Sequence, residues 1–205
     1  MPKPRKKSGS RSIEKRLFIV CEGSKDKSES AYFKSLIKCC HFAGDKVEVR
    51  VIDTRKNTGR ELVKMAKKIK EFPFDEAWVV YDRDGYTLHA ETFSLAKDNK
   101  INIAFSAISF EIWILLHFEF TTHVFQKSDE VIKYIKSKNY MNYEKSRTDV
   151  YSELKNKLKN AIKNAKKMQN HQIDGNPHGT PIYNMNPYTN IDQLINAIYE
   201  LQEDE

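Results

Sequence analysis

The first half of the chain alternates short apolar runs with amphipathic segments, and this alternation constrains the fold more than any other feature. Segments that suit β-strands lie at residues 17–23, 47–53, 76–85 and 101–107; the first is a continuous apolar run, and the second alternates apolar and polar residues. Segments with helical spacing separate them, at residues 24–42, 58–72 and 88–99. Thr58 is expected to cap the second of these helices. A strand–helix alternation of this kind predicts an α/β fold, with an open, mostly parallel sheet flanked by helices on both faces.

The second half of the chain is less regular. Residues 109–120 (SFEIWILLHFEF) suit a buried helix or a strand, and their length and spacing favour a helix. Lysine-rich helices over 128–168, a turn-rich loop over 174–190 and an amphipathic closing helix should follow. We therefore predict a basic flexible arm (1–15) and a single domain (16–205). Within that domain, a sheet core (16–108) precedes a helical C-terminal elaboration (109–205).

Charge and composition indicate which partners and which cellular compartment to expect. The formal net charge is +7 and the sequence pI is about 9.1, which favours a polyanionic partner such as nucleic acid. No apolar run is long enough to cross a bilayer, so no membrane partner is expected. Three cysteines, two of them adjacent, offer no disulfide framework and predict reduced thiols in a cytoplasmic protein. The sequence leaves the oligomeric state undetermined.

Three acidic residues follow two of the predicted strands. Glu22 ends the first strand, and Asp82 and Asp84 end the third. In an open α/β sheet, ligands bind beyond the carboxyl ends of the strands, so these carboxylates converge if the two strands are neighbours. Carboxylate oxygens suit Mg²⁺ or Mn²⁺. Asp-x-Asp-Gly is also a common turn sequence, but the pairing with Glu22 favours a metal site.

Glu111 is a second kind of candidate, because it lies within an apolar segment. An acid between Phe110 and Trp113 needs a partner or a function when it is buried. His117 lies six residues further on, a spacing that places it on a different face of a helix. We interpret His117 as a core histidine rather than a ligand.

Four segments, in order, resemble the RloB-like protein family. They cover roughly residues 15–200 and read LFIVCEGSKDKSESAYFKSLI (17–37), AWVVYDRDGY (77–86), SAISFEIWILLHF (106–118) and PYTNIDQLINAI (187–198). The third resembles a family segment that begins Asn-Pro-x-Phe-Glu. Here Ala107-Ile108-Ser109 precedes Phe110-Glu111, which departs from that pattern.

The resemblance implies a Toprim-like fold, of the kind shared by topoisomerases, DnaG-type primases and OLD-type nucleases. It implies that Glu22 acts as general acid/base and that Asp82 and Asp84 bind Mg²⁺, with Glu111 matching the family's hallmark glutamate. The implied activity is Mg²⁺-dependent (or Mn²⁺-dependent) cleavage of DNA or RNA phosphodiesters. The implied setting is phage defence, including abortive infection and restriction loci.

Two other hypotheses stay open at this point. The chain could be a nucleic-acid-binding or sensing module without chemistry, in which the basic arm and the lysines of 157–170 are the functional part. The loop at 174–190 would then either stack on a base or pack on the sheet edge. The chain could also be a partner subunit of a defence ATPase or of restriction-modification components, because it lacks a P-loop of its own.

Overall fold

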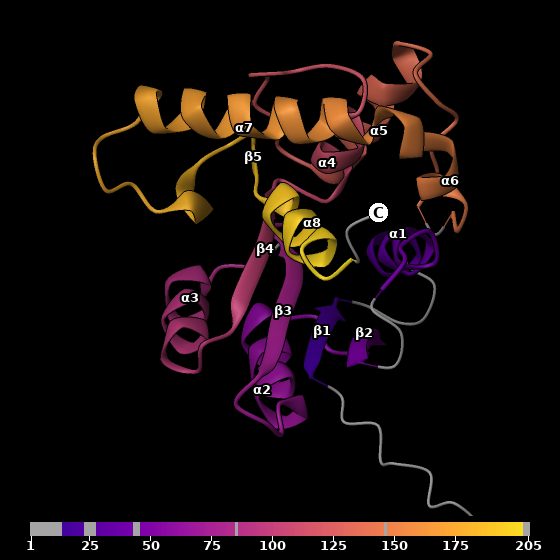
Figure 1. The fold of residues 1–205 in the computed structure, drawn as a ribbon. Coiled ribbons are helices and arrows are strands. Elements are labelled where there is room, and N and C mark those ends of the chain that lie inside the picture. The colour runs from indigo at the N-terminus through magenta and orange to yellow at the C-terminus, as the bar shows by residue number, and fades with distance from the viewer. Residues whose placement is uncertain (1–13, 23–27, 43–45, 85, 146, 203–205) are drawn as a thin grey trace, which may run out of the picture.

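A computed structural model describes residues 14–22, 28–42, 46–84, 86–145 and 147–202. Of the predicted basic arm, residues 1–13 lie outside these ranges. The α/β class is as the sequence predicts: a mostly parallel open sheet lies between helices, and a long helix crosses one end of it (Figure 1).

Five strands form the sheet. They are β1 (Lys15–Cys21), β2 (Val47–Asp53), β3 (Asp75–Asp82), β4 (Asn102–Ala107) and β5 (Tyr188–Thr189). Their order is β2-β1-β3-β4-β5; the first four are parallel, and β5 runs antiparallel to β4. The first and third strands are therefore neighbours, which is the condition for the predicted convergence of their acidic ends.

Helices pack on both faces of the sheet. They are α1 (Ser28–Ile37), α2 (Gly59–Ile69), α3 (His89–Asp98), α4 (Glu111–Leu116), α5 (Ser128–Ser137), α6 (Val150–Leu154), α7 (Leu158–Gly175) and α8 (Ile191–Tyr199). Short 3₁₀ turns lie at η2 (Lys155–Lys157) and η3 (Ile182–Asn184). Thr58 caps α2 as predicted, since its side chain accepts a hydrogen bond from the backbone N–H of Glu61.

The period of two in β1 divides its side chains between two cores. Leu17, Ile19 and Cys21 face a large core that also contains residues of α1 and α4–α8. Phe18 and Val20 face a smaller core with α2 and α3. Both faces of the strand are apolar, which is typical of a parallel sheet covered on both sides.

The C-terminal half adds a strand to the sheet, where the sequence predicts only a turn-rich loop. A two-residue strand is too short to show an alternating pattern, and contacts beyond the strand hold it in place. The side chain of Asn190 accepts a hydrogen bond from Phe105 N at 2.6 Å and donates one to Ile103 O at 3.0 Å. The Thr189 and Ser106 hydroxyls lie 2.9 Å apart. The loop therefore packs against the sheet edge, and Met185 and Tyr188 are buried there.

The structure confirms the helix predicted within 109–120, although α4 covers only Glu111–Leu116. All six of its side chains are buried, so the segment is apolar because it is enclosed on all sides. The region predicted to hold lysine-rich helices contains α5, α6 and α7.

Two expectations from composition can be compared with the structure. Cys21, Cys39 and Cys40 are free thiols. Among the described residues, no helix combines the length and the apolar character that a membrane span requires.

Candidate active site

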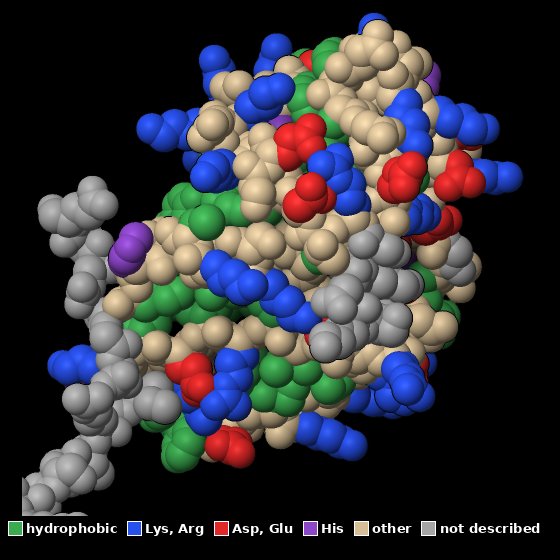
Figure 2. All heavy atoms as spheres, turned by 90° about the vertical axis from the view of Figure 1, so that its right-hand side faces the viewer, with side chains coloured by type: hydrophobic (Ala, Val, Ile, Leu, Met, Phe, Trp, Pro, Cys, Tyr) green, Lys and Arg blue, Asp and Glu red, His purple; other side chains and the backbone are tan. Residues whose placement is uncertain are grey.

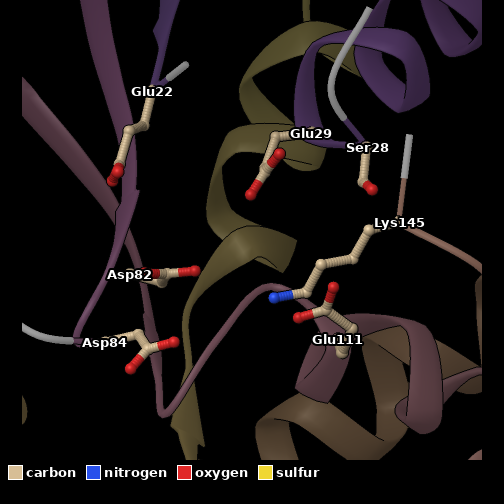
Figure 3. A pocket seen from close by; sticks show the side chains of 7 residues that line it. All are labelled: Glu22, Ser28, Glu29, Asp82, Asp84, Glu111 and Lys145. Carbon is tan, nitrogen blue, oxygen red and sulfur yellow. The ribbon is translucent and has the colours of Figure 1, made fainter. Parts of the chain in front are cut away.

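A pocket of about 250 Å³ opens beyond the carboxyl ends of β1 and β3. These strands meet where the chain order reverses, since β2 lies on one side of β1 and β3 on the other. This is the place at which open α/β sheets bind ligands. The pocket is lined by Glu22, Ser28, Glu29, Asp82, Asp84, Glu111 and Lys145 (Figure 3).

Backbone pairing fixes the acidic ends of the two strands. Glu22 follows the last residue of β1, and its N–H still donates to Val80 O of β3 at 3.2 Å. Asp82 is the last residue of β3, and the next N–H, of Arg83, donates to Ser106 O of β4 at 2.9 Å. Figure 3 shows the side chains of Glu22, Asp82 and Asp84 on one side of the pocket. The structure thus brings together the three acids that the sequence singled out.

Glu111 lies on the opposite side of the same pocket, at the first turn of α4. Its side chain is buried, and Oε1 accepts a hydrogen bond from the Tyr143 hydroxyl at 3.0 Å. Burial and the nearby Glu111 carboxylate raise the pKa of Tyr143, so its hydroxyl stays protonated and continues to donate. Tyr143 therefore orients Glu111 toward the pocket.

His117 lies away from this site, as its spacing from Glu111 predicts. It is fully buried, with Nδ1 2.9 Å from Trp113 O and Nε2 3.2 Å from the Tyr32 hydroxyl. Burial lowers the pKa of His117 to about 4, so the ring is neutral at physiological pH. It is a hydrogen-bonded core histidine.

Asp82 is at the electrostatic centre of the pocket. Burial raises the pKa of the Asp82 carboxyl well above its usual range, and the negative charges of Glu29, Glu22, Glu111 and Asp84 raise it further. Ionised Asp82 therefore has an unfavourable electrostatic environment. A bound cation would relieve that repulsion, because its positive charge offsets the charges of these carboxylates.

The donor set fits a hard divalent cation. Five carboxylates line the pocket, and oxygen ligands of this kind suit Mg²⁺ and Mn²⁺. Among the described residues, no three Asp, Glu, His or Cys side chains already lie in a ligand cluster. Mg²⁺ commonly takes one or two carboxylates and completes its shell with water, so the donor chemistry and this geometry are compatible.

Three lining residues, Ser28, Glu29 and Lys145, were not predicted as site residues from the sequence. Glu29 lies in the first turn of α1, seven positions after Glu22, and the acid-containing segment that follows β1 was a usable signal for it. Lys145 lies between α5 and α6, where the sequence shows no periodicity. No local pattern connects Lys145 to the sheet, so only the packed structure reveals its position.

We expect Asp82→Asn to stabilise the metal-free protein. The folded state holds the Asp82 proton to a higher pH than the unfolded chain does, so wild-type stability falls as the pH rises above about 4. Asparagine removes this dependence. At neutral pH and with chelator present, the melting temperature of Asp82→Asn should exceed that of wild type by about 2–4 °C, the change that about 1 kcal/mol produces in a protein of this size. A lower melting temperature for Asp82→Asn would contradict this electrostatic account.

Comparison with protein families finds one match over most of the chain. The model described as "RloB-like protein" matches residues 17–198. This range includes most of β1, all of β3, the acidic residues and the wall of the pocket that carries Lys145. Neither the curated proteins nor the solved structures give a significant match to the chain.

Proposed function

The chain belongs to the RloB-like protein family, and on this basis we propose that it is a Mg²⁺-dependent or Mn²⁺-dependent nuclease that acts in phage defence. One observation carries the proposal. Glu22, Asp82, Asp84 and Glu111 come from three separate sequence motifs, yet all four line one pocket at the ends of neighbouring parallel strands. Acids gathered in a chain of net charge +7 need a physical reason, and a divalent cation supplies one.

In this proposal Glu22, Asp82 and Asp84 hold the cation. When bound, a divalent cation stabilises negative charge on the phosphate and on the leaving oxygen. Glu22 acts as general base, taking the proton of a water molecule that adds to the phosphorus. The P–O bond to the leaving nucleotide then breaks, and its oxygen gains a proton. Glu111, oriented by Tyr143, supports the wall opposite the strand ends.

A cleavage assay tests the proposal. Purified protein is incubated with labelled single-stranded DNA, duplex DNA and RNA, each with Mg²⁺, with Mn²⁺ and with EDTA. We expect cleavage of at least one substrate with metal and none with EDTA, and no cleavage by Glu22→Gln. Metal-dependent products that are equally abundant with wild type and Glu22→Gln would contradict the assignment of Glu22.

The lysines of α7 support nucleic acid as the partner. Six lysines lie between residues 155 and 167, all six are exposed, and no acidic residue interrupts them. None of the ion pairs between described residues involves them. Figure 2 shows many Lys and Arg side chains on the upper part of the molecule, with Asp and Glu side chains among them, at the height where Figure 1 places α5–α7. Lys157 and Lys167 also lie over the rings of Phe118 and Phe120, with Nζ at 4.1 and 4.3 Å from the ring centroids. Exposed lysines without ion pairs are available to phosphates.

We expect the triple variant Lys159→Gln, Lys163→Gln and Lys166→Gln to bind nucleic acid more weakly and with less salt dependence. Each lost phosphate contact should reduce the magnitude of the slope of log affinity against log salt concentration by about 1. The slope of the triple variant should therefore be smaller than that of wild type by about 3. Fluorescence anisotropy with a labelled oligonucleotide over a KCl series measures both quantities. The matched control changes Lys64, Lys67 and Lys68, three exposed lysines of α2 on the opposite face of the sheet. Equal losses in the two triple variants would contradict a specific role for α7.

The second candidate is a nucleic-acid-binding module that performs no chemistry. One finding favours it: among the described residues, no three His, Cys, Asp or Glu side chains lie close enough together to hold a metal ion as they stand. Titration with Mn²⁺ separates the two functions, because only the nuclease needs carboxylate-dependent metal binding. If metal binds but the chain alone cleaves nothing, co-purification from the native host tests for an ATPase or restriction-modification partner.

A further inference from the structure

Lys145 is the one cation among the described residues that line the acidic pocket. It comes from the segment between α5 and α6, in the C-terminal half of the chain. Figure 3 shows its side chain extending into the pocket from the side that also carries Ser28, Glu29 and Glu111, facing the carboxylates of the strand ends. The C-terminal half thus contributes a positive charge to a pocket that the sheet makes negative.

Neutral contacts hold Lys145 in place. Its Nζ donates a hydrogen bond to the hydroxyl of Ser128 at 2.7 Å, and Ser128 is buried at the start of α5. Two residues earlier, buried Tyr143 is fixed by its hydrogen bond to Glu111, and Met141 is also buried. None of the ion pairs between described residues involves Lys145. The Lys145 ammonium group therefore forms no salt bridge with any of the five carboxylates that line the same pocket.

A phosphodiester carries a negative charge that five carboxylates would repel. A cation held at the strand ends would offset part of this repulsion, and an ammonium group on the opposite wall would act on the phosphate directly. Lysine binds phosphate well as a compact point charge with three donors.

We propose that Lys145 binds a non-bridging oxygen of the phosphodiester that the pocket accepts. The strand ends then bind the cation, and Lys145 on the opposite wall binds the anion. This inference rests on the proposed nuclease function for its substrate class. The competing role for Lys145 is that of a counter-ion, which would only balance the carboxylates until metal displaces it.

The two roles predict different affinities of Lys145→Met for a phosphodiester: a loss if Lys145 binds phosphate, and no change if it is only a counter-ion. The probe is dimethyl phosphate, a single phosphodiester too small to reach α7, and its binding is followed by phosphorus NMR with and without Mn²⁺. We expect Lys145→Met to weaken its binding about tenfold or more, the effect of losing one hydrogen bond to a charged group. Lys145→Arg keeps the charge and should retain most of the affinity. The control is Lys133→Met, an exposed lysine of α5 outside the pocket, and it should match wild type.

Binding of Mn²⁺, measured by electron paramagnetic resonance, completes the test. A phosphate-binding Lys145 leaves Mn²⁺ affinity equal or tighter in Lys145→Met while phosphate affinity falls. Tighter Mn²⁺ binding with unchanged phosphate affinity would establish the counter-ion role and overturn the proposal, as would the absence of dimethyl phosphate binding by wild type. If wild type binds phosphate through Lys145 but cleaves no nucleic acid, the phosphate site stands and the nuclease function fails.

Discussion

We expect Asp82→Asn to lower metal-dependent cleavage about a thousandfold or more. Asparagine keeps the size of the side chain but removes the charge that a divalent cation needs at the centre of the pocket. Asp82 experiences the negative charges of Glu29, Glu22, Glu111 and Asp84, so it is electrostatically coupled to all the other carboxylates that line the pocket. The initial rate of oligonucleotide cleavage at saturating Mg²⁺ measures the loss.

The control for this prediction is Asp98→Asn, an exposed aspartate at the end of α3 that does not line the pocket. It should cleave at the wild-type rate. Because Asp82→Asn is expected to be more stable than wild type without metal, a loss of activity in this variant cannot be attributed to unfolding. Cleavage by Asp82→Asn at a rate similar to that of Asp98→Asn would remove Asp82 from the mechanism.

The second large effect concerns stability, at the amino end of the same strand. Asp75 begins β3, pairs in register with Arg16 of β1 and is almost fully buried. Arg16 donates to both of its carboxylate oxygens, at 2.7 and 2.6 Å. The backbone N–H groups of Glu71 and Phe72 donate to Oδ2 at 2.7 and 2.8 Å. Burial disfavours the charged form, but these four hydrogen bonds outweigh it and lower the pKa of Asp75 to about 2.

We expect Asp75→Ala to reduce the free energy of unfolding by about 3–5 kcal/mol, because it leaves a largely buried guanidinium and two backbone donors without a partner. The folded pKa lies below the unfolded value near 4, so the contribution of Asp75 is present above pH 4. This contribution is lost as the pH falls toward 2, so the difference in the free energy of unfolding between wild type and Asp75→Ala should shrink over this range. Urea unfolding of both proteins at several pH values measures this difference.

Glu71→Gln is the matched control, since Glu71 contacts the same arginine at 3.4 Å but is two-thirds exposed, at 67%. Exposed ion pairs contribute about 0–1 kcal/mol, so Glu71→Gln should be nearly neutral. If Asp75→Ala reduced the free energy of unfolding no more than Glu71→Gln does, the buried Arg16–Asp75 pair would not be a main stabilising contact between β1 and β3 at this end.

Much of the fold is predictable because its determinants are local. The first four strands are segments of six to eight residues that are either apolar or alternate apolar with polar residues, and α2 keeps a clear helical period. The strand β5 could not be predicted from local sequence. Asn190 and Thr189 hold it against β4 through contacts with residues more than 80 positions away in sequence. Its two residues carry no period of their own.

The candidate site likewise contains residues that the sequence predicts and others, among them Lys145, that it does not. Glu22, Asp82 and Asp84 could be predicted because each follows an apolar strand, and parallel strands collect their ends at one edge of a sheet. Glu111 could be identified because an acid in an apolar segment needs a partner, and Tyr143 supplies one. Lys145 could not, because its position depends on how the C-terminal half packs across the pocket rather than on its sequence neighbours.

The central claim is that the acids at the ends of β1 and β3 bind a divalent cation. A crystal of the protein soaked in Mn²⁺ tests it most directly, through the anomalous scattering of manganese. We expect an anomalous peak coordinated by Asp82 together with Glu22 or Asp84, and no peak in crystals of Asp82→Asn treated in the same way. An empty pocket in the wild-type crystal, or manganese bound only elsewhere on the protein, would contradict the account.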